Sequence, residues 1–225
     1  MTEYWDLLDE NREPLGLLHR RGDALPAGAR HLCVEIITVC NGRILTTLRH
    51  PQKHNGGYWE VTTGSALAGE DSRTAAVREL YEETGIRAEK EELILFDHVI
   101  TPRIFSDTYL LRLAEEPKIA LQSTETVDYA WLTPAELLER CRAGMVIGHL
   151  AERFARYAVM LEDVLQKEGE KRTNTTGRWS WTGCWKCWRS RRPARPARNW
   201  RCGWSPVITT GTPAMPCGGP PISTH

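Results

Sequence analysis

The segment from residue 64 to residue 86, GSALAGEDSRTAAVRELYEETGI, constrains this 225-residue chain more than any other part of it. No Gly or Pro interrupts the run from Ser72 to Thr84, so these residues are predicted to form one helix. Asp71 or Ser72 is the expected N-cap, because both side chains can accept a hydrogen bond from the first helical turn. Gly85 follows as the residue that tolerates the left-handed conformation in which helices end.

Three carboxylates recur on this predicted helix at a spacing that has a chemical meaning. Glu79, Glu82 and Glu83 stand at positions i, i+3 and i+4, so they share one face. A solvated helix usually pairs each glutamate with Lys or Arg four positions later, whereas here Glu79 is followed by Glu83. Crowded like charges cost free energy unless a cation neutralises them, and hard oxygen ligands suit Mg²⁺ or Mn²⁺. The opposite side of the helix is predicted to pack on a sheet through Val77, Leu80, Tyr81 and Thr84.

Two further charged residues accompany the three carboxylates. Arg78 places a positive charge beside Glu79 and is predicted to orient a neighbouring glutamate. Glu70 precedes the helix in a loop, where it is positioned to hold a second ion or a water molecule.

Every fixed position of one family signature is occupied in this segment. The nine residues concerned are Gly64, Glu70, Arg78, Glu79, Leu80, Glu82, Glu83, Gly85 and Ile86. The chain therefore resembles the Nudix hydrolase superfamily, a far more specific match than a lone short motif. The resemblance implies an α/β Nudix fold, a mixed β-sheet sandwiched between α-helices, over residues 1–169. It also implies a Mg²⁺ or Mn²⁺ cofactor, with the Gly64 carbonyl as a further metal ligand.

The remainder of this region alternates between strand and helix patterns. Apolar and β-branched runs predict strands at residues 4–9, 15–19, 31–40, 43–49, 58–63, 93–100, 108–114 and 126–132. Asn41-Gly42 is a hairpin turn signal, and Thr133-Pro134-Ala135-Glu136 is a capping box that opens a helix to about Ala143. Helical spacing of apolar residues then predicts a terminal helix that ends near Lys167.

Several loop residues are candidates for the rest of the site. Glu125 precedes a strand, in a region where Nudix relatives often place one more acid. It would act as general base, as an alternative to Glu79, or complete the metal site, against the reading of a plain surface acid. Lys53 and His54 lie in a polar loop that could contact phosphates, although an ordinary loop is the safer interpretation. The loop from residue 101 to 107 is expected to shape the substrate pocket.

His31 and the cysteines within residues 1–170 have ordinary structural interpretations. Nudix relatives of the isopentenyl diphosphate isomerase type use a histidine as a ligand near the position of His31. A lone His at a strand start is more often a structural residue. Cys33 and Cys40 lie in an apolar run and are expected to be buried thiols. No segment is long and apolar enough to span a membrane, and the acidic start is unlike a secretory signal, so a cytoplasmic location is expected.

The chain divides into two parts of unlike composition. Residues 171–225 hold ten of the 29 basic residues and none of the 29 acidic ones, so residues 1–170 carry a net charge of minus ten. Six of the nine Trp fall in the basic tail, where Cys184 and Cys187 look like half a zinc site without its partner half. Trp, Arg, Gly, Pro and Cys, which are frequent in this tail, all have codons rich in G and C. A disordered, frameshift-derived tail over 170–225 is favoured over a nucleic-acid-binding one.

The predicted function is metal-dependent hydrolysis of a diphosphate linkage in a nucleoside diphosphate joined to another group, or in a related small diphosphate. The opening WDLLDENREPLGLLHRRGDALPAGARHL is similar to a Nudix branch that resembles isopentenyl diphosphate isomerase. Isomerases of that type place an essential Cys around the position of the box glycine, where this chain has Thr62, Thr63 and Ser65. A non-catalytic nucleotide sensor is a third interpretation. A homodimer is the assembly that the resemblance suggests, and no membrane or nucleic-acid partner is expected.

Overall fold

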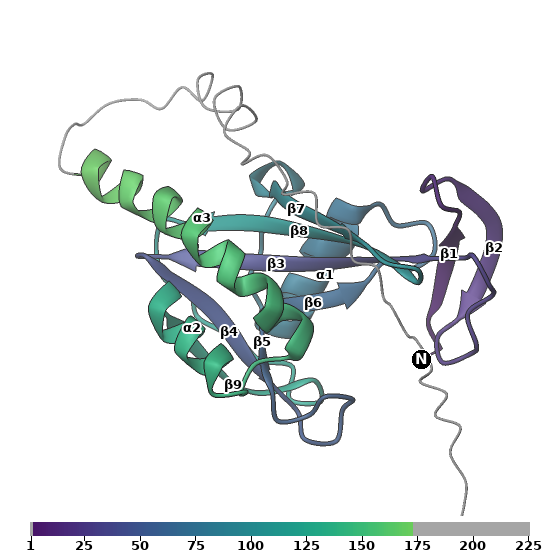
Figure 1. Cartoon of the computed structure of the whole chain (residues 1–225), viewed down its shortest axis with the longest axis horizontal. Coiled ribbons are helices and arrows are strands. Elements are labelled where there is room, and N and C mark those ends of the chain that lie inside the picture. The colour runs from purple at the N-terminus through teal and green to yellow at the C-terminus, as the bar shows by residue number, and fades with distance from the viewer. Residues whose placement is uncertain (1, 173–225) are drawn as a thin grey trace, which may run out of the picture. The chain divides into compact units, whose positions relative to one another are not determined.

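The computed structural model describes residues 2–172 and shows nine strands, three α-helices and one 3₁₀-helix in that range (Figure 1). The strands are β1 (Tyr4–Leu8), β2 (Pro14–Arg20), β3 (His31–Cys40), β4 (Arg43–Arg49), β5 (Trp59–Glu60), β6 (Thr62–Ser65), β7 (Ile94–Ile100), β8 (Ile104–Leu113) and β9 (Thr126–Leu132). The helices are α1 (Ser72–Thr84), η1 (Lys90–Glu92), α2 (Pro134–Arg142) and α3 (Gly148–Arg172). The tail from residue 173 on, with Cys184 and Cys187, lies outside the described residues.

A seven-stranded mixed sheet forms the centre of the molecule. Its main path runs β5-β4-β3-β8-β7, with β6 paired to β3 and β9 paired to β4. β3 and β8 run parallel over ten paired positions, from His31 opposite Ile104 to Cys40 opposite Leu113, and the other pairs are antiparallel. Parallel neighbours need a long crossover connection, which the segment containing α1 supplies.

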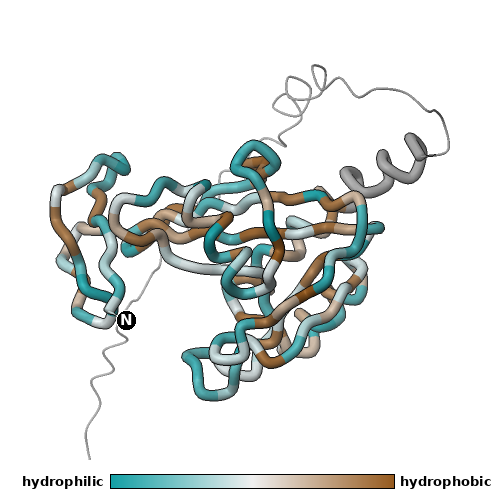
Figure 2. The backbone as a smooth tube through the Cα atoms, turned by 180° about the vertical axis from the view of Figure 1, so that it is seen from behind, coloured by the Kyte–Doolittle hydropathy of each residue, from teal (hydrophilic) through white to brown (hydrophobic). Residues whose placement is uncertain are grey.

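Helices cover both faces of this sheet, as predicted. β3 alternates between them: Val34 and Ile36 face α1, whereas Ile37 and Val39 face α2 and α3. The first core includes Ala75, Ala76 and Leu80 of α1; the second includes Leu137, Leu150, Phe154 and Tyr157 of α2 and α3. Hydrophobic residues follow the central strands while connecting loops are mostly hydrophilic (Figure 2). The sandwich of a mixed sheet between helices confirms the expected Nudix fold.

The predicted strand over residues 58–63 is wrong in one respect. It is two short strands, β5 and β6, separated by the buried Val61. β5 pairs with β4, but β6 pairs with β3, with Gly64 opposite Val34. The backbone thus changes partners at Val61, and this change sets Gly64 against Glu79 and Ser65 against Arg78, in the middle of α1.

The predicted loop over residues 101–107 is also wrong for most of its length. β8 begins at Ile104, so only a short turn remains between β7 and β8. The segment pairs because residues 104–107 lie opposite residues 31–34 of β3 on one side and opposite β7 on the other. Central strands of this kind are fixed by two neighbours, whatever their local propensity.

Other local predictions are confirmed. Asn41 and Gly42 both have positive φ, 50° and 74°, as the two-residue hairpin turn requires. Thr133 caps α2 through the predicted capping box with Glu136. Cys33 and Cys40 are free thiols as expected, but only Cys40 is buried, whereas Cys33 is half-buried. Among the helices within residues 2–172, none has the length and hydropathy needed to cross a membrane.

Candidate active site

Helix α1 begins and ends where its sequence predicts. Asp71 is the N-cap and accepts a hydrogen bond from Thr74 N at 2.6 Å. Gly85 adopts φ 74° and donates its N–H to the Tyr81 carbonyl. The prediction that Tyr81 packs on the sheet is wrong, because its side chain is 46% exposed and bonds Arg87, whereas Leu80 and Thr84 are buried. The apolar side of α1 is therefore narrower than expected.

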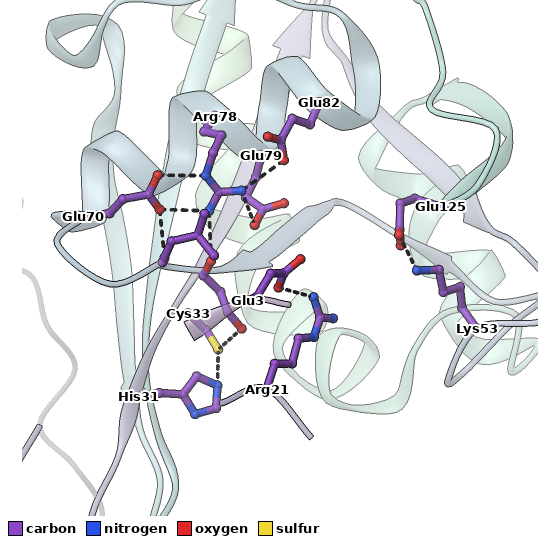
Figure 3. A network of polar contacts seen from close by, with 12 residues as sticks. Glu3, Arg21, His31, Cys33, Lys53, Glu70, Arg78, Glu79, Glu82 and Glu125 are labelled. Atoms are coloured by element: carbon purple, nitrogen blue, oxygen red, sulfur yellow. Dashed lines mark hydrogen bonds and ion pairs between the residues drawn. The ribbon is translucent and has the colours of Figure 1, made fainter. Parts of the chain in front are cut away.

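Arg78 connects the acidic residues of the site (Figure 3). Its Nε donates to Glu70 Oε1 at 2.8 Å, and its Nη1 donates to Glu79 Oε1 at 2.9 Å and Glu82 Oε2 at 3.0 Å. Nη2 bonds Glu70 Oε2 at 2.9 Å and the Ser65 carbonyl at 3.0 Å. Although burial opposes it, these bonds to Glu70 and Glu79 raise the pKa of Arg78. Arg78 therefore contacts three carboxylates at once, which agrees with its predicted orienting role.

The contacts of Glu70 suit a residue that positions Arg78 better than they suit an exposed metal ligand. Besides the two bonds from Arg78, it accepts the Leu67 N–H at 2.8 Å. Burial raises its pKa, but the bonds from Arg78 and Leu67 outweigh this and leave its pKa lowered. Glu70 is thus a charged carboxylate that closes the loop between β6 and α1 on itself.

Gly64 is required because Glu79 lies directly over it. A Cβ atom at Gly64 would stand 1.9 Å from Glu79 Cδ and 2.1 Å from Glu79 Oε1. Burial raises the pKa of Glu79 to about 7, against the opposing charge of Arg78. The carboxylate is therefore held in a pocket that only a glycine leaves open.

Glu83 is the most deeply buried of the three carboxylates. It is 5% exposed, and its Oε2 has no hydrogen-bond partner within the described part of the chain. Burial, followed by the charges of Glu60 and Glu79, raises its pKa well above the ordinary value. A buried carboxylate oxygen without a partner is costly, which is the condition expected of a ligand awaiting a cation.

Glu60 is a site residue whose role sequence reasoning did not assign. It comes from β5, is 3% exposed, and accepts Arg49 Nη1 at 2.6 Å. Burial raises its pKa to about 7, against the Arg49 contacts. The sequence signal that could have identified Glu60 was a single acid between the apolar residues Trp59 and Val61. An acid at such a position is buried only where it is paired.

Glu125 lies on the same side of the molecule as this buried pair. Its side chain forms an ion pair with Lys53, and its charge acts on both Glu60 and Glu83 (Figure 3). The Glu125 carbonyl also accepts the His50 N–H at 2.8 Å, which ties the loop before β9 to the loop after β4. The structure therefore brings Glu125 and Lys53 to the site, where the two side chains form an ion pair with each other.

The acidic residues fit a divalent metal ion. Among the described residues, no three His, Cys, Asp or Glu side chains converge in a group ready to hold a metal. Arg78 takes up Glu79 and Glu82, while Glu83 points into the buried region near Glu60. The partnerless Glu83 oxygen and the Glu79 carboxylate over Gly64 nevertheless provide hard oxygen donors of the type that Mg²⁺ and Mn²⁺ bind.

His31 and Cys33 form a separate group at the start of β3. His31 stacks on Trp5, with ring centroids 4.0 Å apart, and its Nε2 lies 3.3 Å from Cys33 Sγ. Burial lowers the pKa of His31 to about 4 and raises that of Cys33 to about 11. These contacts support the structural interpretation of His31. Cys33 Sγ also lies 3.8 Å from Ser65 Oγ, beside the box glycine, a proximity that the sequence did not reveal.

Comparison with known proteins shows which family the chain resembles. The NUDIX domain model matches residues 29–149. An uncharacterized Nudix hydrolase of Listeria monocytogenes is 34% identical over 142 residues, 60% of this chain and 82% of that protein. An RNA pyrophosphohydrolase of Dinoroseobacter shibae is 32% identical over 118 residues, 44% of this chain and 72% of that protein.

Two further likenesses bear on the fold and on the family branch. An isopentenyl-diphosphate Delta-isomerase of Pectobacterium atrosepticum is 35% identical over 111 residues, 48% of this chain and 55% of that protein. The crystal structure of DR0079 from Deinococcus radiodurans superposes with a TM-score of 0.58 at 26% identity, covering 68% of this chain and 98% of that one.

Fold and relatives together define a hydrolase that acts on phosphorus-containing anhydrides. The chain belongs to the Nudix family. Hydrolases of this family generally act with a divalent metal ion, in agreement with the acidic residues on α1.

Proposed function

We propose that the chain hydrolyses a diphosphate linkage in a nucleoside diphosphate joined to another group, or in a related small diphosphate, with Mg²⁺ or Mn²⁺. The observation that carries this proposal is the partnerless Glu83 oxygen, buried on the same helix as Glu79 and Glu82. A bound divalent ion would neutralise the phosphate charge and lower the pKa of the attacking water.

The chain's own residues have distinct roles in this proposal. Glu79, Glu82 and Glu83, with the Gly64 carbonyl, would hold the metal, and Gly64 leaves the space that Glu79 occupies. Arg78 keeps Glu79 and Glu82 on one side of α1, and Glu70 fixes Arg78 from the opposite direction. Glu70 would reach a second ion or a water only by giving up that contact.

Glu79 and Glu125 remain the two candidates for the general base. Burial raises the pKa of Glu79 to about 7 in the metal-free chain, so Glu79 would act as the base only when it is not held as a metal ligand. Glu125 is held by Lys53, which would have to turn away before Glu125 could take a proton from water. Lys53 would then be free to bind a substrate phosphate.

The Glu83→Gln substitution tests the metal assignment. Gln is nearly isosteric and suits a position where the raised pKa of Glu83 already favours the neutral form, so the fold is expected to persist. Turnover is expected to vanish when nucleotide sugars, dinucleotides, oxidised nucleoside triphosphates and isoprenoid diphosphates are screened with Mg²⁺. Glu91→Gln, an exposed change in η1, is the matched control. Wild-type rates for Glu83→Gln would refute the assignment.

Isopentenyl diphosphate isomerisation is a second candidate, favoured by one specific contact. Cys33 of β3 lies beside Ser65, so a thiol is present near the box glycine after all. Burial keeps that thiol protonated, as a proton donor to carbon would need to be. Incubation with isopentenyl diphosphate separates the two reactions, because proton NMR detects a shifted double bond and phosphorus NMR detects a released phosphate.

A further inference from the structure

The hairpin β1–β2 is attached to the loop that opens the Nudix helix, although it precedes the residues that match the family model. The Ala68 N–H donates to the Tyr4 carbonyl at 2.8 Å, and the Gly69 N–H donates to Asp6 Oδ2 at 2.7 Å. Both bonds join β1 to the segment between β6 and α1. The position of the hairpin is therefore coupled to the position of the box loop.

A second set of contacts holds the turn of the same hairpin. Arg12 Nη1 donates to Asp107 Oδ1 at 2.9 Å, and Asp107 is 4% exposed. Asp107 also accepts the Ser72 hydroxyl at 2.5 Å, at the first residue of α1. The hairpin is thus held both at β1 and at its turn, so its open end has a defined place relative to α1.

That open end carries two arginines around a hollow of about 390 Å³ lined by Thr2, Glu3, Arg20 and Arg21. Arg21 Nη1 donates to Glu3 Oε2 at 2.6 Å, with side chains 57% and 39% exposed. Arg20 instead bonds Asp23 at 2.7 Å. An ion pair this exposed contributes little stability, so its loss would leave the hairpin folded.

The Glu3–Arg21 pair lies beside the acidic residues of α1. Figure 3 shows the Glu3 carboxylate next to Glu79, with the Arg21 guanidinium beyond it. Glu3 is close enough for its charge to act on Glu79, and Arg21 is close enough to act on Cys33. A carboxylate therefore pairs with the Arg21 guanidinium at the end of the hairpin that lies near α1.

We propose that Arg21 is a specificity-determining residue that binds a substrate phosphate beyond the cleaved linkage, taking that phosphate in place of the Glu3 carboxylate. A guanidinium binds phosphate through the same paired N–H donors that it offers a carboxylate. The proposal rests on the proposed function, because it assumes that a diphosphate binds at α1.

The positive charge of Arg21 indicates the substrate class. A diphosphate linkage would already be neutralised by metal ions bound at the α1 carboxylates, so an added guanidinium would gain from a third phosphate more than from an uncharged group. The preferred substrates are therefore compounds with three or more consecutive phosphates.

Binding measurements test this assignment without turnover. The probes are ATP with methylene groups at both the α,β and the β,γ bridges, and α,β-methylene ADP, titrated calorimetrically into the full chain with MgCl₂. Arg21→Gln is expected to weaken the triphosphate analogue about tenfold and the diphosphate analogue less than about twofold. Glu3→Gln frees Arg21 and is expected to tighten the triphosphate analogue. Arg43→Gln, an exposed change at the β3–β4 turn, should alter neither affinity.

Three results would overturn the proposal: no binding of the triphosphate analogue to the wild-type chain, unchanged affinity in Arg21→Gln, or equal changes of the same sign in Arg21→Gln and Glu3→Gln. The last result would describe a surface ion pair and nothing more. Because binding is measured without hydrolysis, a failure of the screened compounds to turn over would count against the proposed reaction and leave this test intact.

Discussion

The contact between Gly64 and Glu79 allows one substitution to separate catalysis from stability. A methyl group at Gly64 would lie 1.9 Å from Glu79 Cδ, whereas ordinary van der Waals contact begins near 3.4 Å. The carboxylate of Glu79 must therefore move by about 1.5 Å. A displacement on the order of 1 Å costs roughly a hundredfold in rate when the displaced group acts in the reaction.

The fold should tolerate the same change. The atoms that the methyl group would meet belong to the flexible end of Glu79, which can turn away without moving the backbone. We therefore expect Gly64→Ala to lower kcat about a hundredfold while the free energy of unfolding changes by less than about 1 kcal/mol. Mn²⁺ affinity, followed by electron paramagnetic resonance, should fall with kcat because Glu79 is an assigned ligand.

Gly148→Ala is the matched control for this experiment. Gly148 begins α3, and a Cβ atom there would meet nothing within 4 Å. Its kcat and Mn²⁺ affinity should equal those of the wild type. If Gly64→Ala also kept both, Glu79 would not need its present position, and the assignment of Glu79 as a ligand would be wrong.

Three other perturbations test the buried site, the core and the tail. Because the folded-state pKa of Glu60 is raised by burial to about 7, metal-free protein should lose stability as pH rises from about 4.5 to 7, and Glu60→Gln should reduce that loss in thermal unfolding; an unchanged pH slope would argue against the shift. Phe154→Ala, at a fully buried position, should cost about 3–5 kcal/mol in urea unfolding, whereas Val159→Ala, 69% exposed, should cost almost nothing; equal costs would place Phe154 outside the core. Deletion of residues 171–225 should leave turnover and Tm unchanged, and loss of either would show that the tail is needed.

Short-range patterns predicted the elements well because their causes are local. The cap of Asp71, the left-handed Gly85 and the turn at Asn41-Gly42 each depend on residues within one turn of the chain. The errors arose where a distant strand decided the outcome. β5 and β6 separate because they bind different neighbours, and β8 starts early because β3 and β7 both pair with it.

The same division applies to the active site. The sequence by itself determined the family, the helix and the spacing of Glu79, Glu82 and Glu83, since helical geometry follows from residue number alone. Tertiary structure decided how those three carboxylates differ: Glu82 is exposed, Glu79 lies over Gly64, and Glu83 is buried near Glu60. Burial and neighbouring charge depend on strand pairing between residues far apart in sequence, and no local pattern encodes them.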